Sequence, residues 1–375
     1  MTNQVNKQIK QNPDTLHFFA DTGTECFFTL NAQASESILR LERDLWEFDR
    51  ISGSFSDFGK HQLLQNFLIR EIQATNAIEG IQSKPDDILY CLKSQKKGKN
   101  KKIISVTNAY SILLDQTAKV PENLQDIRDL YDRLMKGAVE KKDLPDGEYF
   151  RKEYVYINNG LKTVHQGFYP EQAVNQGMTE FLNVYNDNSK EIFERLILTH
   201  YMIEAVHPFY DGNGRLGRFL FTLGLYAKTG SYLSFSVASA INQKRSAYYK
   251  AFNEAQHEHM FGSLNSYFED ISSILHSYFA SLNQELQEKK SQIDSFSVSS
   301  SEFTKSEQKI LKMLTEAALL SEFGITNNEI IEHGDLSKRT VISAIQKFRE
   351  MNLLDETKIG RFEYHRLKLE HIGRL

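Results

Sequence analysis

The stretch HPFYDGNGRLGR, residues 207–218, constrains this 375-residue chain more than any other part of it. It lies between two segments whose apolar residues recur at helical spacing, which predicts a turn between two helices. Gly212, Asn213 and Gly214 allow a sharp turn with converging N–H groups, and Arg215 then opens the second helix. Because the start of a helix favours anions, the sequence predicts a phosphate-binding turn.

The charged side chains of this stretch fit the same interpretation. Arg215 and Arg218 are three residues apart on the second helix, so both guanidinium groups can face one polyphosphate. Asp211 can hold Mg²⁺, which normally takes carboxylate and phosphate oxygens together with water. His207 suits a general base, because an ordinary imidazole has a pKa of ~6.5. A role in packing alone is disfavoured, because clustered charges without a ligand are costly to bury.

The stretch resembles the signature of the Fic family, HPFx(D/E)GNGRxxR. The resemblance implies a protein adenylyltransferase, which moves AMP from ATP to a hydroxyl side chain of a target protein. It also implies roles for single residues: His207 is the base, Asp211 holds Mg²⁺, and Arg218 binds the γ phosphate. The α and β phosphates are bound by Gly212, Asn213, Gly214 and Arg215.

Bulk properties exclude several classes of protein. The composition, with 40% hydrophobic and 25% charged residues, is ordinary for a globular protein, and a net charge of −4 gives no reason to expect nucleic acid or a membrane surface as partner. Cys26 and Cys91 are far apart, which supports neither a disulfide framework nor a zinc site. The polar N-terminus has no signal-peptide pattern, and no apolar run could span a membrane. We therefore expect a cytoplasmic protein.

The chain is long enough for two or three domains. We expect a mainly α fold: an N-terminal helical region at 1–115, a Fic-type helical core at 116–290, a serine-rich linker at 291–303 and a small α+β module at 304–375. In the N-terminal region, apolar residues recur at helical spacing from about Glu36. We expect these stripes, which include Leu39 and Trp46, to lie in the core.

The segment TNAIEG, residues 75–80, ends the second N-terminal helix, expected at about 60–80. Gly80 is a natural residue to follow a helix C-terminus, which places Glu79 where the helix dipole disfavours an anion. Such a glutamate requires a cation, or is simply exposed. In the Fic family, (S/T)xxxE(G/N) is the inhibitory motif, and Thr75, Glu79 and Gly80 match it. The resemblance implies that Glu79 pairs with Arg218 and blocks productive placement of the γ phosphate.

Two further segments bear on substrate binding. RKEYVYI, residues 151–157, predicts a strand, and Asn158-Asn159-Gly160 predicts a hairpin turn. The resemblance implies a flap at about 151–168 whose edge, including Val155 and Ile157, aligns the target segment; a plain surface hairpin is the alternative. Tyr249 and Gln256 match positions that line the nucleoside side of the pocket, although aromatic residues at helical spacing are more often core.

The C-terminal part predicts a winged-helix domain. Thr304 and Glu307 form a capping box, Ser337 caps a third helix, and two strands flank Gly360. The third helix carries Lys338, Arg339, Lys347 and Arg349, which are candidates for contacts with DNA. Because acidic residues nearly balance basic ones, the module lacks the charge that DNA binding demands, and protein interaction or homo-oligomer packing is favoured.

The leading hypothesis is therefore transfer of AMP from Mg·ATP to a Ser, Thr or Tyr hydroxyl, with Glu79 inhibiting the resting enzyme. Within the family, removal of AMP, both activities in one enzyme, and transfer of another phosphate-bearing group are alternatives. A kinase is disfavoured, because the phosphorylating relatives carry lysine where this chain has Gly214. From another class, the chain could be a DNA-binding regulator whose Fic-like part senses nucleotide.

Overall fold

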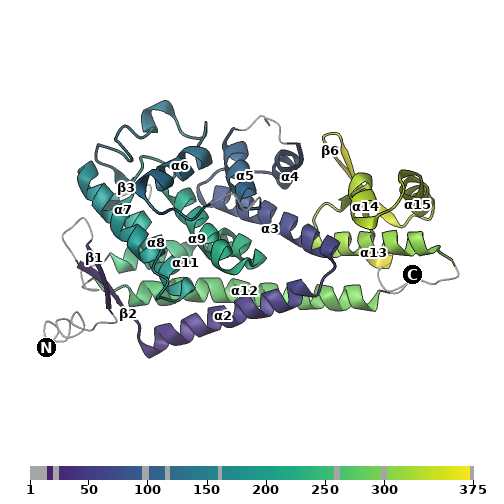
Figure 1. The fold of residues 1–375 in the computed structure, drawn as a ribbon, viewed down its shortest axis with the longest axis horizontal. Coiled ribbons are helices and arrows are strands. Elements are labelled where there is room, and N and C mark those ends of the chain that lie inside the picture. Colours follow the sequence, from purple (N-terminus) through teal and green to yellow (C-terminus); the bar gives the residue numbers. More distant parts are fainter. Residues whose placement is uncertain are drawn as a thin grey trace. The chain divides into compact units, whose positions relative to one another are not determined.

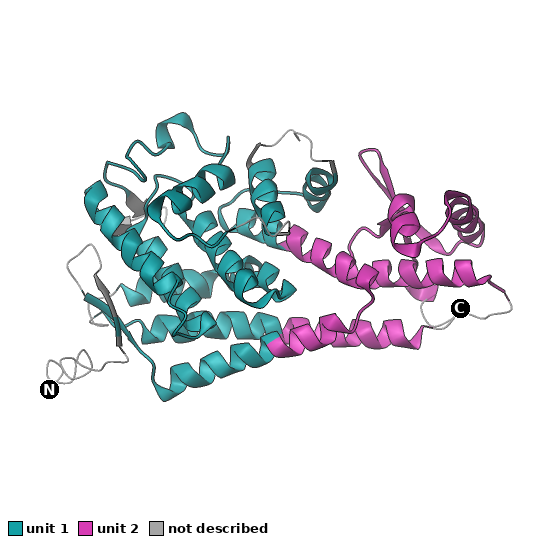
Figure 2. Ribbon diagram, in the orientation of Figure 1, with its two compact units in different colours: residues 1–45, 71–279 teal, residues 46–70, 280–375 magenta. Residues whose placement is uncertain are grey.

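The computed structural model describes residues 15–19, 25–94, 101–114, 119–158, 163–256, 262–296 and 302–371. This part of the chain is mainly helical, and its strands form only small sheets (Figure 1), which confirms the predicted fold class. No helix within these residues is long and apolar enough to cross a lipid bilayer. The chain divides into two compact units, residues 1–45 with 71–279 and residues 46–70 with 280–375 (Figure 2).

The first unit is organised around helix α8, Ile192–Val206, in which almost every residue is buried. A helix that is buried on all sides belongs in the centre of a domain. On either side, α8 packs along α7, Glu171–Tyr185, and α9, Asn213–Thr229. The remaining helices of this unit are α4, Pro85–Ser94; α5, Lys101–Leu114; α6, Leu124–Leu134; α10, Val237–Gln243; and α11, Arg245–Ala255; short 3-10 helices span Lys141–Asp143 and Tyr232–Ser236.

Two antiparallel hairpins also belong to the first unit. Strand β1, Thr15–Phe19, pairs with β2, Glu25–Thr29, and β3, Tyr156–Asn158, pairs with β4, Thr163–Gln166. The strand expected from Arg151 begins only at Tyr156. The reason is that Arg151 is buried and its guanidinium binds main-chain carbonyls, so this part of the chain follows the protein core instead of a sheet. The expected turn residues Asn159 and Gly160 lie outside the described residues.

Three long helices contribute residues to both units: α2, Ala32–Gly53; α3, Asp57–Ile78; and α12, Asn265–Ser295. The expectation that Leu39 and Trp46 of α2 are core residues is wrong, since their exposed fractions are 60% and 64%. Both residues belong to an apolar stripe on α2 that is wider than the face of this helix that packs against other elements. Helix α12 continues through Ser295, into the stretch expected as linker, and Ile293 in this extension is buried.

In the second unit, residues 302–371 form a C-terminal module of helices and strands. Its helices are α13, Lys305–Leu320; α14, Asn327–Gly334; and α15, Lys338–Glu350, followed by a 3-10 turn at Leu369–His371. Its strands β5, Ile325–Thr326; β6, Leu354–Ile359; and β7, Phe362–Leu367, form a sheet in the order β5-β7-β6. The capping box of Thr304 and Glu307 is present, and Phe58 of α3 joins the apolar core of the module.

Candidate active site

The turn between α8 and α9 is held in one conformation by its own side chains. Helix α8 ends at His207, whose φ of 52° and ψ of 63° are left-handed, and Pro208 prevents the helix from continuing. The Asn213 side chain accepts a hydrogen bond from the Phe209 N–H at 2.9 Å and donates one to the Phe209 carbonyl at 2.7 Å. This pair of hydrogen bonds fixes the loop that carries the catalytic candidates.

Helix α6 contacts the same loop and helps to hold it in place. The Tyr131 ring stacks on Phe209 with centroids 3.6 Å apart, and its hydroxyl donates to the main-chain carbonyl of Asp211 at 2.9 Å. Gly212 has a φ of 90°, and a Cβ at this position would lie 2.7 Å from Cε of Met135. Only glycine fits this turn without strain. Sequence reasoning missed Tyr131, which lies 80 positions before its partner Asp211.

Arg215 lies at the start of α9, and two of its donor atoms have no partner among the residues that the structure describes. The residue is 3% exposed, and its Nη2 donates to Oδ1 of Asp211 at 3.2 Å. Its Nε and Nη1 atoms are buried and have no hydrogen-bond partner among the described residues. The N-cap residue Gly212 supplies no side-chain cap either, so N–H groups of the first turn are also available. Buried donors without acceptors are costly, and an anion such as phosphate satisfies them together.

Arg218, one turn further along α9, is 1% exposed, and its Nε and Nη2 donate to residues at the C-terminal end of α3. Its Nη2 donates to Oε1 of Glu79 at 2.6 Å and to the Thr75 carbonyl at 3.3 Å, and its Nε donates to Oγ1 of Thr75 at 3.0 Å. Burial opposes ionisation of Glu79, but the guanidinium of Arg218 beside it lowers the pKa of this carboxyl below its ordinary value. Burial likewise works against the charge on Arg218, and Glu79 more than offsets it, so that the pKa of Arg218 is raised.

Local geometry explains why Glu79 reaches this position. Helix α3 ends at Ile78, and Gly80 adopts a φ of 71°, which turns the chain back so that the Ile81 N–H donates to the Asn76 carbonyl. A Cβ added at Gly214 would lie 2.5 Å from Oε1 of Glu79. The glycine in α9 therefore leaves the space that the carboxylate of Glu79 fills.

A glutamate within α3, Glu71, which sequence reasoning missed, fastens the helix to the core. Glu71 is fully buried and accepts hydrogen bonds from the N–H groups of Ala238 and Ser239 at 2.8 and 3.1 Å, and from Oγ1 of Thr222 at 3.3 Å. Burial raises the pKa of Glu71 to about 7, although these donors act in the opposite direction. The contacts place α3 against α9 and the start of α10, with Thr75 one turn further on.

His207 faces two acceptors of a single residue, Glu204. Nδ1 of the imidazole lies 3.3 Å from the main-chain carbonyl of Glu204 and 3.9 Å from its carboxylate Oε2. The main-chain carbonyl of His207 accepts from Nε of the buried Arg151 at 2.8 Å. Arg151 also donates to the Phe168 carbonyl, so it joins the base of the β3–β4 hairpin to the catalytic turn. Neither Glu204 nor Arg151 was predicted from sequence to serve the site.

The nucleoside candidates lie in and just after α11, and the structure gives them different surroundings. Tyr249 is 44% exposed, with the guanidinium of Arg245 lying 5.7 Å from its ring centroid. Gln256 has a buried Oε1 without a partner among the described residues. The neighbouring Tyr248 is buried, and its hydroxyl lies 2.8 Å from Nε2 of His200. Burial lowers the pKa of His200 to about 3, so this histidine is neutral and structural.

The flap candidates are only partly described. Val155 is half-buried, and Ile157 pairs with His165 in the β3–β4 register, but the side chains of the hairpin lie outside the described residues. The main-chain carbonyl of Val155 accepts from the Gly167 N–H at 3.2 Å. A Cβ at Gly167 would lie 3.0 Å from Cβ of His207, so the base of the hairpin lies directly beside the histidine.

A magnesium ion fits Asp211 only with help from a ligand. The residues that the structure describes include no cluster of three or more His, Cys, Asp or Glu side chains suited to a metal. The Asp211 side chain is 45% exposed and gives one oxygen to Arg215, and no hydrogen bond to its other oxygen is found in this part of the chain. One accessible carboxylate suits Mg²⁺, which commonly takes its remaining ligands from phosphate and water.

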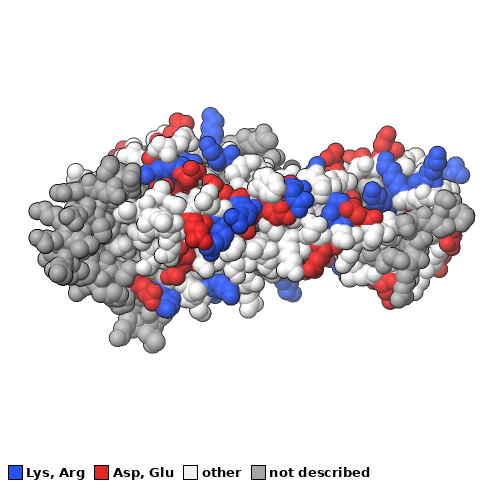
Figure 3. Space-filling model, turned by 90° about the horizontal axis from the view of Figure 1, so that it is seen from below, with Lys and Arg blue, Asp and Glu red and all other residues white. Residues whose placement is uncertain are grey.

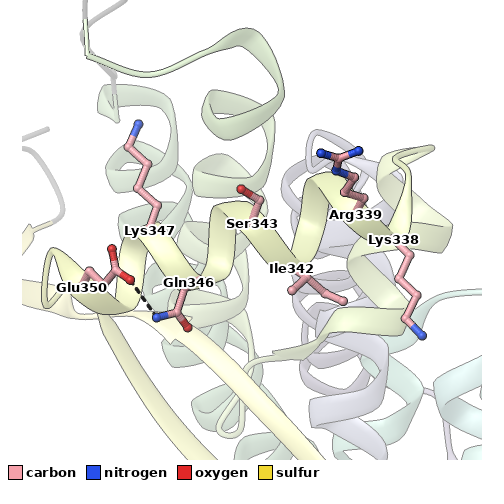
Figure 4. Close-up of a pocket in the computed structure, with 7 residues that line it drawn as sticks. All are labelled: Lys338, Arg339, Ile342, Ser343, Gln346, Lys347 and Glu350. Carbon is pink, nitrogen blue, oxygen red and sulfur yellow. Dashed lines mark hydrogen bonds between the residues drawn. The ribbon is translucent and has the colours of Figure 1, made fainter.

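The third helix of the C-terminal module presents a shallow groove of about 800 Å³ lined by one face of α15 (Figure 4). Lys338, Arg339 and Ile342 are exposed there. Lys347 pairs with Glu307 at 3.1 Å, and Arg349 on the same helix pairs with Glu356 at 2.7 Å. Two of the four candidate cations for DNA are therefore neutralised. Acidic and basic side chains are interspersed on the face shown in Figure 3.

The fold and the site define a helical domain with a helix N-terminus that carries unsatisfied donors, a histidine beside it and an arginine held by residues from an earlier part of the chain. Residues 121–225, which contain α6 to α8 and most of α9, match the model of the Fic/DOC family. The matched segment contains the catalytic turn but neither Thr75 and Glu79 nor the C-terminal module. No curated protein matches the sequence.

The solved structures that are similar to the chain include the following two. The crystal structure of a Fic family protein from Desulfovibrio desulfuricans is 18% identical, with a TM-score of 0.56 over 91% of this chain and 97% of that one. Fic-1 from C. elegans is 17% identical, with a TM-score of 0.49 over 68% of this chain and 74% of that one. At this identity the first likeness shows a shared fold.

Proposed function

We propose that the protein transfers AMP from Mg·ATP to a Ser, Thr or Tyr hydroxyl of target proteins, itself included. The observation that carries the proposal is the buried guanidinium of Arg215 at the N-terminus of α9, close to His207 in the sequence, whose Nε and Nη1 have no acceptor within the described part of the chain. This is a site built for an anion next to a base. The Fic/DOC family match of the segment supports the nucleotide as that anion.

Each residue of the turn has a role in the proposed reaction. Nε2 of His207 takes the proton of the target hydroxyl, whose oxygen forms a bond to the α phosphorus while the bond to the bridging oxygen breaks and pyrophosphate leaves. The N–H groups after Gly212 and the side chain of Arg215 bind the phosphates and offset the charge that develops. Asp211 would hold Mg²⁺, which supplies further neutralisation of the phosphates. Positioning and charge stabilisation provide most of the catalysis in reactions of this kind.

In the proposed resting state, Glu79 pairs with the guanidinium of Arg218, to which the γ phosphate would otherwise bind. Arg218 already makes three hydrogen bonds to Thr75 and Glu79, and it is fully buried by them. A triphosphate that enters this site must therefore displace the carboxylate or bind without Arg218. Either outcome places the nucleotide poorly for transfer, so wild-type activity should be weak.

The test is mass spectrometry of protein incubated with Mg·ATP. We expect an adduct of AMP on Glu79→Gly protein, or on lysate proteins exposed to it, and little on the wild type. The double variant Glu79→Gly/His207→Ala should give no adduct, although it still binds ATP. Absence of both the adduct and magnesium-dependent ATP binding in Glu79→Gly protein would contradict the proposed function.

Removal of AMP from a modified protein is the second candidate. The observation that favours it is that Glu79 gives one carboxylate oxygen to Arg218, while no hydrogen bond to its other oxygen is found in the described part of the chain. Such an oxygen could position a water molecule for attack on phosphorus. Wild-type protein supplied with an AMP-modified target would then release free AMP, and a Glu79→Gln variant would not. Release at equal rates by both variants would exclude this role.

A further inference from the structure

Glu204 is a buried carboxylate in the catalytic turn that none of the roles above uses. It lies on α8, three residues before His207, and its side chain is 17% exposed. Its Oε1 atom is buried and has no hydrogen-bond partner among the described residues. The carboxylate lies against the first turn of α9. If Gly214 and Gly217 there carried Cβ atoms, these atoms would lie 3.5 and 3.3 Å from Oε1 of Glu204. Two glycines thus make room for it.

The surroundings of the imidazole determine which nitrogen carries the proton. The main-chain carbonyl of Glu204, at 3.3 Å, and its carboxylate, at 3.9 Å, both face Nδ1 of His207. Carbonyl oxygens only accept hydrogen bonds, and so does an ionised carboxylate. A neutral imidazole in this position therefore carries its hydrogen on Nδ1. The lone pair is then on Nε2, the nitrogen that a general base needs free.

We propose that Glu204 is a positioning residue for His207: it keeps the proton on Nδ1, and its carboxylate stabilises the imidazolium that forms when Nε2 takes a proton. The inference deepens the proposed transfer reaction and rests on it. A base oriented by a third group is a recurring arrangement in enzymes that activate a hydroxyl. Here the orienting group precedes the base by three residues on the same helix.

Other charged and titratable groups also act on this pair. Burial raises the pKa of Glu204 to about 7; Arg218 lowers it, and Glu79 raises it further. The positive charge of Arg151 lies on the main-chain side of His207. The titratable and charged groups that face the pair from the surrounding elements are Glu79, just after α3, Arg218 of α9, Tyr248 of α11 and Tyr267 of α12, and His200 of α8 lies beside Glu204 across Gly217.

The sign of the pH effect follows from these charges. Below about pH 7 Glu204 is mostly protonated and cannot stabilise an imidazolium; above it the carboxylate is ionised and can. With Glu204 in place, the transfer rate should rise through neutral pH as the two groups titrate together. A neutral glutamine removes the anion, which lowers the pKa of the imidazole. The acid limb of the profile of transfer rate against pH then moves to lower pH, and the rate on its plateau falls.

The kinetic test uses the Glu79→Gly background, in which transfer is released. We expect Glu204→Gln to lower the plateau of kcat by about 10-fold or more, to leave the KM for ATP within about twofold, and to shift the acid limb down by about half a pH unit or more. Glu194→Gln is the matched control, because Glu194 is also buried on α8 but pairs with Lys190 away from the turn. A lower plateau with an unmoved acid limb, or no change at all, overturns the inference.

A second measurement does not need activity. Nitrogen NMR of ¹⁵N-histidine protein, with His207 assigned by its loss in His207→Ala, should show the proton on Nδ1, and Glu204→Gln should lower the pKa of the imidazole. A proton on Nε2 in the wild type overturns the inference even when Glu79→Gly protein transfers AMP. Absence of transfer by Glu79→Gly, together with a proton on Nδ1, contradicts the proposed function and leaves the positioning of His207 standing.

Discussion

Glu79 and Arg218 lie 139 residues apart in the sequence, and their side chains meet at 2.6 Å in the first unit. Arg218 is buried by this contact, and its pKa and that of Glu79 are shifted in the directions that strengthen the pair. Breaking a buried pair by removing one partner leaves an uncompensated charge, so the released guanidinium acquires a strong demand for another anion. A phosphate of the nucleotide meets that demand in the proposed reaction.

Thr75 should contribute to inhibition separately from Glu79. Its Oγ1 accepts from Nε of Arg218 at 3.0 Å, and Thr75→Val removes this hydrogen bond while keeping the shape of the side chain. A hydrogen bond to a charged group contributes about 1.5–3 kcal/mol, so we expect AMP transfer to rise by about 10-fold, and less than in Glu79→Gly. Thr107→Val on α5 is the control, because Thr107 is equally buried and bonds only within its helix. Rates equal to wild type in Thr75→Val would contradict this prediction.

Inhibition should not depend on pH above the neutral range. The pKa of Glu79 is below its ordinary value, so the stabilisation from its pair with Arg218 is present above the unfolded value and is lost only as pH falls through the lower folded value. We expect the ratio of Glu79→Gly to wild-type rates to stay constant within about twofold between about pH 8 and about pH 9, where Glu204 is ionised in both proteins. Radiolabelled AMP incorporation across this range measures the ratio. A ratio that falls steeply on acidification would mean that Glu79 is protonated there.

Arg215→Lys should weaken nucleotide binding. Lysine keeps the charge but cannot reproduce the planar fork whose Nε and Nη1 lack acceptors in the structure. By calorimetry in the Glu79→Gly background, we expect ATP affinity to fall by about 10-fold or more, the equivalent of about 1.4 kcal/mol. Arg195→Lys provides the comparison, since Arg195 is also buried in the first unit but donates to the Tyr185 carbonyl. Equal affinities for both variants would argue against a phosphate at Arg215.

The C-terminal module should bind DNA weakly and without sequence preference. Lys347 and Arg349 are held by glutamates, which leaves Lys338 and Arg339 as the exposed cations of the α15 face (Figure 4). Fluorescence anisotropy with labelled duplexes at several salt concentrations measures the number of phosphates contacted. We expect the slope of log affinity against log salt concentration to correspond to about two phosphates or fewer. The slope should be smaller still in Lys338→Glu. A steep slope with preference for one sequence would instead support the regulator hypothesis.

The turn between α8 and α9 could be predicted from sequence because the residues that shape it are contiguous. His207, Asp211 and Arg215 lie within nine positions, and the glycines between them dictate a turn at a helix start whatever surrounds it. The end of α3 could also be predicted from sequence, because Gly80 stops a helix at a fixed distance from Thr75. The contact between that segment and Arg218 came from the family resemblance, because no local rule predicts a meeting across so many residues.

The supporting residues could not be predicted, because each acts through a contact that only the fold creates. Tyr131 and Glu71 look like ordinary members of helical patterns, and Arg151 like part of an aromatic strand, yet each one holds the main chain of a distant segment. Glu204 also acts through a contact that only the fold creates, although its partner His207 is close in the sequence. Its position three residues before a histidine is visible in the sequence, but its orientation depends on the left-handed backbone of His207, which no propensity specifies.

Since Glu79 and Arg218 belong to the same molecule, dilution cannot separate them. A tethered competitor acts as though it were present at a constant local concentration, about millimolar for short flexible connections and higher where the tether is rigid. In the proposed enzyme, the fraction of molecules open to ATP would therefore be the same at any expression level. It would change only when something alters α3 itself.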